Sequence, residues 1–136
     1  MKVIVAIDER NGMMFNKCRQ SQDVKLREYL LQLTQGSNLF LNEYSFNQFK
    51  DEDVSNIIVD NDFLEKANDD FCFVENQALL PYLNKISTVY LCRWNRDCPS
   101  DMKFDIDLTT GFKLRTAVDI VRKSHEKITI EEWQKI

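Results

Sequence analysis

Apolar residues gather in short runs along this chain, and polar stretches separate the runs. The first run, Lys2 to Ile7, is rich in β-branched residues and predicts a strand buried on both faces of a sheet. Similar runs predict strands at Leu39 to Leu41 and Thr88 to Trp94. Asn56 to Asp60 and Phe71 to Val74 predict two more strands, which we expect to be buried.

A different spacing of apolar residues predicts one long amphipathic helix. It begins near Ser21, which can serve as N-cap, with Asp23 in the first turn, where the helix dipole favours a carboxylate. It ends near Gly36. Its buried stripe has the i, i+3, i+4, i+7 spacing and consists of Leu26, Tyr29, Leu30 and Leu33.

Shorter elements complete the pattern. Tyr44 to Phe49 predicts a short helix, and Ala78 to Leu83 predicts one or two helical turns. Phe112 to Arg115 and Ile128 to Ile130 are candidates for edge strands. Strands that alternate with helices indicate an α/β fold with a mainly parallel central sheet flanked by helices. The 136 residues are expected to form a single domain, residues 1–136.

Composition excludes several classes of protein. The net charge of −4 disfavours a broad nucleic-acid surface. The apolar runs are far shorter than the ~20 residues of a bilayer span, and no signal peptide follows Met1, so we expect a cytoplasmic protein that does not contact membranes. One histidine and the absence of any metal-loop spacing predict no metal site. The cysteines form no Cys-x-x-Cys motif and are expected to be reduced.

Several stretches of the sequence, which together span nearly the whole chain, resemble successive segments of dihydrofolate reductase. VIVAIDERNGMMFN is similar to the first strand and active-site loop of that family, and LREYLLQLTQGSNLFLNEYSFNQF to its first long helix, second strand and next helix. FVENQALLPYLNKISTVYLCRWNR and DIDLTTGFKL resemble later segments. Reductases are usually longer, and the shortened part lies between Val59 and Phe71. The resemblance implies a dihydrofolate reductase-like fold with C-terminal edge strands.

The residues that would bind NADPH in this family are replaced. Where reductases place a Gly-Gly pair beside the cofactor pyrophosphate, this chain has Glu75 and Asn76, and a carboxylate there repels a dianion. Where reductases commonly have Gly-Arg-x-Thr after the second strand, this chain has Asn42 to Ser45, with Glu43 in place of the arginine. We therefore expect no cofactor, and a loss of NADPH binding and hydride transfer.

The carboxylate that assists folate protonation in the family is also replaced. The matching position carries Leu26. Asp23 lies one turn earlier on roughly the same helix face, which makes it the candidate catalytic residue. The alternative is a first-turn aspartate favoured by the helix dipole.

The densest polar stretch, Asn16 to Asp23, is expected near the cleft. Backbone amides at the helix N-terminus and Arg19 could hold an anion there. A small phosphate or carboxylate site would be formed by Lys17, Arg19, Arg93 and Arg96, with Trp94 as a stacking surface. The alternative is a set of solvated side chains around a turn. The candidates for ligand binding are Lys17, Arg19, Gln20, Asp23, Arg27, Glu75, Asn76, Arg93 and Arg96.

A second resemblance concerns a name. The phrases NGMMFN, RQSQD and FVEN are similar to those of small bacterial proteins that often carry the label ribonuclease Z. The zinc ligands of the tRNA-processing ribonuclease Z include a His-x-His-x-Asp-His motif. One histidine cannot build that site, so we expect the label to be a transferred one.

Three functions stay open at this point. The first is a pseudoenzyme of the reductase fold. It would bind a small anionic or heterocyclic ligand, or a protein partner, through the cleft that holds the active site in the reductases. The second is an enzyme, either a reductase with an altered cofactor or a hydrolase that works from Asp23, Glu75 and Arg19. The third is a structural protein with a filled cleft, which predicts a large apolar patch or a homodimer interface.

Overall fold

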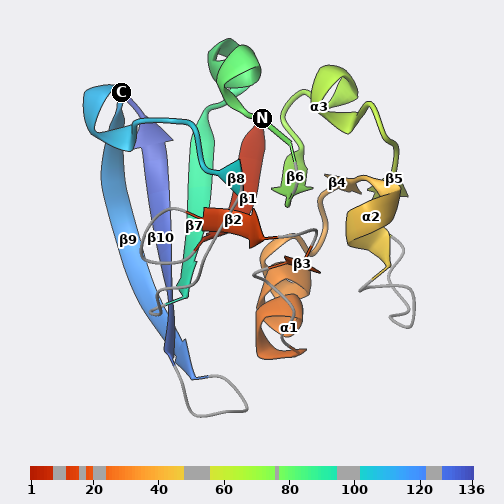
Figure 1. Cartoon of the computed structure of the whole chain (residues 1–136), viewed down its shortest axis with the longest axis horizontal. Helices are drawn as coiled ribbons and strands as arrows, with labels where there is room; N and C mark the ends of the chain where they lie inside the picture. The colour runs from red at the N-terminus through yellow and green to blue at the C-terminus, as the bar shows by residue number, and fades with distance from the viewer. Residues whose placement is uncertain are drawn as a thin grey trace.

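A seven-stranded sheet forms the centre of the molecule (Figure 1). The computed structural model describes residues 1–7, 12–15, 18–19, 24–47, 56–75, 77–94, 102–121 and 127–136. The strand order is β5-β4-β6-β1-β7-β10-β9. Five strands are parallel, and β9 and β10 are antiparallel to their neighbours. The strands are β1 (Lys2–Ile7), β4 (Leu39–Leu41), β5 (Ile57–Val59), β6 (Phe71–Val74), β7 (Thr88–Trp94), β9 (Phe112–Val121) and β10 (Lys127–Lys135).

Strand β1 lies in the middle of this sheet, as its apolar sequence predicts. It pairs in parallel with β6 on one side and with β7 on the other, and Val3 to Ile7 are buried. The prediction for Asn56 to Asp60 was wrong in one respect. A strand forms there, but Ile58 is 37% exposed and Val59 is 39% exposed because β5 is the edge of the sheet. An apolar run alone does not tell an edge strand from a central one.

The long helix α1 (Val24–Leu33) confirms three of the four residues of the predicted amphipathic stripe, and the side chain of the fourth, Leu26, lies outside the described ones. Leu30 is buried, and Tyr29 and Leu33 pack against the same apolar cluster. After the helix, Gly36 has a φ of 82°, a left-handed conformation that favours glycine in the turn leading to β4. Ser21 and Asp23, the predicted start, lie outside the described residues. No helix in the described part of the chain is long and apolar enough to span a bilayer.

The short helices differ in part from the predictions. Helix α2 (Glu43–Phe46) starts one residue before the expected Tyr44, and residues 48 and 49 of the predicted helix lie outside the described ones. The predicted turn at Ala78 to Leu83 is the 3-10 helix η1 (Leu80–Lys85). Two further elements were not expected from the sequence: α3 (Phe63–Lys66) and the 3-10 turn η2 (Leu108–Thr110).

The two C-terminal strands are longer than the sequence indicated. Strands β9 and β10 form an antiparallel ribbon that extends beyond the other strands in Figure 1. β9 is the edge strand, and β10 lies between it and β7. The register shifts between Glu132 and Trp133, where a bulge changes the twist of the ribbon. Most residues of β9 are exposed, and its sequence therefore lacks the apolar run that marks a buried strand.

A second, small sheet lies beside the first. Its order is β3-β2-β8, formed by β2 (Gly12–Phe15), β3 (Cys18–Arg19) and β8 (Met102–Lys103). β2 pairs with β8, so the segment after β1 and the segment after β7 are joined by backbone hydrogen bonds. This pairing holds the chain that follows β8 against the central sheet, where it contributes to the candidate site.

Both faces of the central sheet are covered by apolar side chains. Helix α1 packs on one face, where alternate residues of β1, Ile4 and Ala6, join the cluster around Leu30. Helix α2 contributes to both clusters, with Phe46 in this one and Tyr44 in the other. The other face carries α3, η1 and the segment that leads into β9. Its buried members include Val3, Val5, Ile7, Phe63, Leu64, Leu79, Val89, Leu91, Phe104, Ile106, Leu108 and Phe112.

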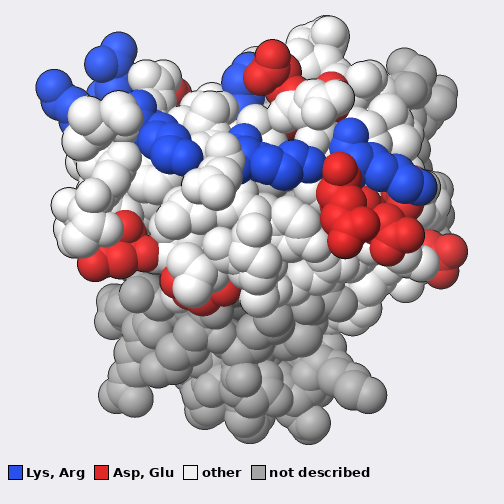
Figure 2. Space-filling view, turned by 90° about the horizontal axis from the view of Figure 1, so that it is seen from above, with Lys and Arg blue, Asp and Glu red and all other residues white. Residues whose placement is uncertain are grey.

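Figure 2 shows a row of Lys and Arg side chains across the end of the sheet where both termini lie. Lysines at this end have partners within the chain. Lys85 donates to the carbonyls of Leu64 and Glu65, at 2.9 and 3.0 Å, and Lys135 donates to the carbonyl of Leu83 at 3.0 Å. These carbonyls belong to α3 and η1, whose last turns leave acceptors unpaired. The lysines thus stabilise helix ends.

Removing the cap of α2 is expected to destabilise the fold by about 1 kcal/mol. The side chain of Asn42 is buried and accepts a hydrogen bond from the backbone N–H of Ser45 at 2.9 Å. In Asn42→Ala this donor loses its acceptor, and the melting temperature should fall. Asn47→Ala, an exposed asparagine just after the same helix, is the matched control. Equal melting temperatures for the two variants would contradict the capping assignment.

Candidate functional site

Successive residues of strand β7 point to opposite faces of the central sheet. Cys92 is buried on the face that α1 covers. Leu91 belongs to the cluster on the opposite face, and Arg93 lines a pocket together with it. Since side chains alternate along a strand, the guanidinium of Arg93 lies on the face away from α1.

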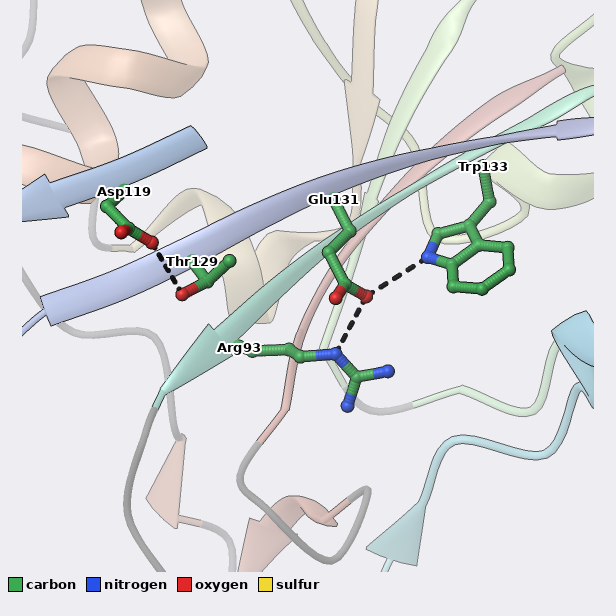
Figure 3. Close-up of polar contacts among 5 residues, drawn as sticks. All are labelled: Arg93, Asp119, Thr129, Glu131 and Trp133. Carbon is green, nitrogen blue, oxygen red and sulfur yellow. Dashed lines mark hydrogen bonds and ion pairs between the residues drawn. The ribbon is translucent and has the colours of Figure 1, made fainter. Parts of the chain in front are cut away.

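Arg93 is held by its neighbour on β10. Its Nε donates to Glu131 Oε1 at 2.8 Å, and the indole Nε1 of Trp133 donates to the same oxygen at 3.1 Å. Figure 3 shows Glu131 between the two donors, with the guanidinium end of Arg93 pointing away from the carboxylate. Farther along the ribbon, the hydroxyl of Thr129 donates to Asp119 Oδ1 at 2.8 Å. Glu131 therefore fixes both the arginine and the plane of the tryptophan.

The segment between β8 and η2 forms the facing wall of the pocket. Phe104, Ile106 and Leu108 point into the core, so the alternate residues Asp105 and Asp107 are exposed. Asp105 accepts hydrogen bonds from the backbone N–H groups of Leu79, at 3.1 and 3.2 Å, and Leu80, at 3.0 Å. Its carboxylate therefore caps the start of η1, although 25 residues separate Asp105 from Leu80 in the sequence.

Asp107 caps the next turn, η2. Its Oδ1 accepts from the backbone N–H of Thr109 at 3.0 Å and from the Thr109 hydroxyl at 2.6 Å. These two hydrogen bonds lower the pKa of the Asp107 carboxyl below its usual value, so the group stays ionised at neutral pH. The other carboxylate oxygen, Oδ2, has no hydrogen bond to any described residue.

Together these elements enclose a pocket of about 390 Å³. Its floor is apolar, one side is formed by the arginine and the tryptophan, and the rim carries the two aspartates. The lining residues are Leu91, Arg93, Phe104, Asp105, Ile106, Asp107, Leu108, Thr109 and Trp133. A volume of this size lies at the lower end of the range of about 300–1,000 Å³ that small-molecule sites have.

Of the residues expected to bind a ligand, the structure places four. Glu75 is buried directly after β6, and Arg27 is half-buried on α1. Arg93 lines the pocket on the opposite face from α1. The backbone of Arg19 lies in β3, opposite Met14. Arg93 and Arg27 are therefore not brought together on one face. The remaining candidates, Lys17, Gln20, Asp23, Asn76 and Arg96, lie outside the described residues.

The buried thiols have little capacity for chemistry. Burial raises the pKa of Cys72 and of Cys92 to about 12, so both remain protonated at neutral pH. A protonated thiol is neither a good nucleophile nor a metal ligand. Within the described ranges, no group of three or more His, Cys, Asp or Glu side chains is placed to hold a metal ion.

Sequence reasoning missed most of the pocket. Asp105, Asp107, Glu131 and Trp133 were not candidates. A signal was present for Asp107, because Asp followed by Thr two positions later is typical of a capped turn. The alternation of polar and apolar residues from Lys127 to Glu131 also predicts a strand with one polar face, to which Glu131 belongs. Neither pattern predicts that the segment with Asp107 and the segment with Glu131 lie on the same pocket.

No protein-family model matches the sequence, and no curated protein matches it. The structure is similar to that of a dihydrofolate reductase from Enterococcus faecalis, solved in complex with NADP(H) and RAB-propyl. The TM-score is 0.70, the sequence identity is 11%, and the match covers 98% of this chain and 95% of that chain. With the sheet order described above, this similarity confirms the predicted architecture. The chain has the dihydrofolate reductase fold.

Proposed function

We propose that this chain is a non-reductase member of the fold, which binds a small ligand but neither binds NADPH nor transfers hydride. The observation that carries the proposal is the carboxylate of Asp105 at the start of η1. In α/β proteins that bind dinucleotides, free backbone amides between a strand and the next helix hold the pyrophosphate. Here the N–H groups of Leu79 and Leu80 already have an anionic acceptor from the chain itself.

The start of α2 supports the same proposal. The backbone N–H of Ser45 donates to Asn42 Oδ1, and the N–H of Glu43 donates to Asn61 Oδ1 at 3.2 Å. The amides that follow β4 are thus satisfied by side chains, and the first helical residue is an acid. A phosphate group would have to displace these acceptors and lie beside the carboxylate of Glu43.

Charge at the end of β6 points in the same direction. Glu75 follows the strand directly and is 4% exposed. Together with the carboxylate of Asp105, it places two acidic side chains around the connection between β6 and η1, where a pyrophosphate would need small residues and positive charge.

A thermal-shift titration tests this proposal. A ligand that binds only the folded state raises the free energy of unfolding, by about 2.7 kcal/mol at a ligand concentration of 100 times Kd, and the melting temperature rises with it. We expect NADPH and folates to leave the melting temperature of this chain unchanged. A reductase that binds NADPH, titrated in parallel, should show the full shift and validates the assay.

The contrary result is equally clear. Saturable stabilisation by NADPH would overturn the proposal and restore the reductase interpretation. In that case dihydrofolate reduction, followed by the loss of NADPH absorbance, would be the activity to measure. Absence of both the shift and the turnover would support the proposal.

A further inference from the structure

The Arg93 pocket contains two polar groups that no described residue pairs with. Nε of Arg93 is used by Glu131, whereas its two terminal nitrogens have no hydrogen-bond partner among the described residues. Across the pocket, Oδ2 of Asp107 is also without a partner there. The other polar groups are committed: Asp105 to backbone amides, Thr109 to Asp107, and the indole N–H of Trp133 to Glu131.

The unfilled groups define what a ligand must offer. The two terminal nitrogens of a guanidinium form a planar fork, which binds two adjacent acceptors on one edge of a flat molecule. A carboxylate oxygen needs an N–H or O–H donor. Between them, the indole of Trp133 and the side chains of Leu91 and Phe104 provide an apolar wall and floor. The ligand is therefore flat, with acceptors on one edge and a donor on another.

The charge of the pocket decides between an anionic and a neutral ligand. One guanidinium, Arg93, faces the carboxylates of Glu131, Asp105 and Asp107. The guanidinium is already neutralised by Glu131, so the carboxylates at the rim give the pocket a negative character. An anion gains little from Arg93 and is repelled at the rim. A neutral heterocycle is not repelled by the carboxylates at the rim.

We propose that this pocket binds a neutral planar heterocycle of nucleobase size, with guanine as the best fit among the natural bases. The deduction rests on the proposed function, because it names the ligand class of that non-reductase site. Arg pairs with the O6 and N7 acceptors of guanine through its fork. The adjacent edge of guanine carries N–H donors, which the free oxygen of Asp107 accepts. The pocket is open at the aspartate rim, so a ribose can remain in solvent.

The proposal also predicts an order of affinity. Adenine places an amino donor where guanine has O6, and a donor cannot pair with a guanidinium. Adenosine should therefore bind at least tenfold more weakly than guanosine. Guanosine 5′-monophosphate should bind more weakly than guanosine, because its phosphate adds negative charge near Asp105 and Asp107. This second difference should shrink as salt is added, since both aspartates are exposed.

Isothermal titration of the full chain with guanosine, adenosine, uridine and guanosine 5′-monophosphate tests these statements. Two conservative variants probe the two unfilled groups. Arg93→Lys keeps a cation beside Glu131 but removes the fork, and Asp107→Asn keeps the cap on Thr109 but turns the second acceptor into a donor. Each should weaken guanosine binding tenfold or more. Arg115→Lys, an exposed arginine on β9 outside the pocket, is the matched control and should bind as the unchanged protein does.

Any of three results would overturn the proposal. The first is no heat of binding for guanosine up to about 1 mM, a Kd that corresponds to a binding free energy of only about −4 kcal/mol. The second is equal guanosine binding by the unchanged chain and Arg93→Lys, and the third is tighter binding of the monophosphate than of the nucleoside. Melting curves of each variant show whether it is folded. NADPH is titrated in the same series, so a failure of the nucleobase assignment and a failure of the proposed function give different results.

Discussion

Phe63→Ala is expected to lower the free energy of unfolding by about 3–5 kcal/mol, the largest effect of any substitution considered for this chain. Phe63 is 0% exposed and is the first residue of α3. Its ring packs in the apolar cluster on the face opposite α1. Alanine removes most of this contact area and leaves a cavity, because the neighbouring side chains fill the space only in part.

Urea unfolding, followed by circular dichroism, measures this change. Leu80→Ala is the matched control, since Leu80 is also an apolar residue of a short helix on this face but is 53% exposed. Its substitution should change stability by less than about 0.5 kcal/mol. If Phe63→Ala lost no more stability than Leu80→Ala, α3 would not be packed against the sheet as described.

A rise in pH from 8 to 10 is expected to destabilise the fold by roughly 1–2 kcal/mol for each buried thiol. Burial raises the pKa of Cys72 and Cys92 from 9.0 to about 12. In the unfolded chain these thiols lose their protons first, so above pH 9 the unfolded state binds fewer protons than the folded state. Stability therefore falls as pH rises, and it continues to fall until the folded thiols ionise.

The variant Cys72→Ala/Cys92→Ala isolates this contribution. It should be less stable than the unchanged protein at pH 8, because it has lost two buried side chains, but it should lose less stability between pH 8 and pH 10. Tyr29 and Tyr90, whose pKa values are also raised by burial, are present in both proteins and leave a common pH dependence. Identical losses in the two proteins would mean that the thiols do not cause the effect.

Much of the sheet could be predicted from the sequence because central parallel strands are apolar on both faces. The bounds of β1 and β7 match the predicted Lys2 to Ile7 and Thr88 to Trp94, since these strands have neighbours on both sides and apolar layers above and below. The predictions fail where this condition is not met. The edge strands β5 and β9 are partly exposed, so their sequences do not show whether or how far a strand extends.

The candidate site was harder to predict, because its contacts join distant segments. Asp105 and Leu80 are 25 residues apart, and Arg93 and Glu131 are 38 apart. The sequence drew attention to Arg93 through its position at a strand end, but the side of the sheet depends on strand register, which one residue can reverse. Local patterns identify which segments are polar, and the tertiary fold decides which of them meet.

The central position of β1 has a consequence for how this chain folds during synthesis. Lys2 pairs with Phe71 on one side and with Thr88 on the other, so β1 leaves the ribosome about 70 residues or more before either of its partners. At about 5–20 residues per second, this wait lasts several seconds. During that time an apolar strand is exposed with both edges free, a state that favours aggregation. We therefore expect the yield of soluble protein to depend on chaperones that cover β1 until β6 and β7 emerge.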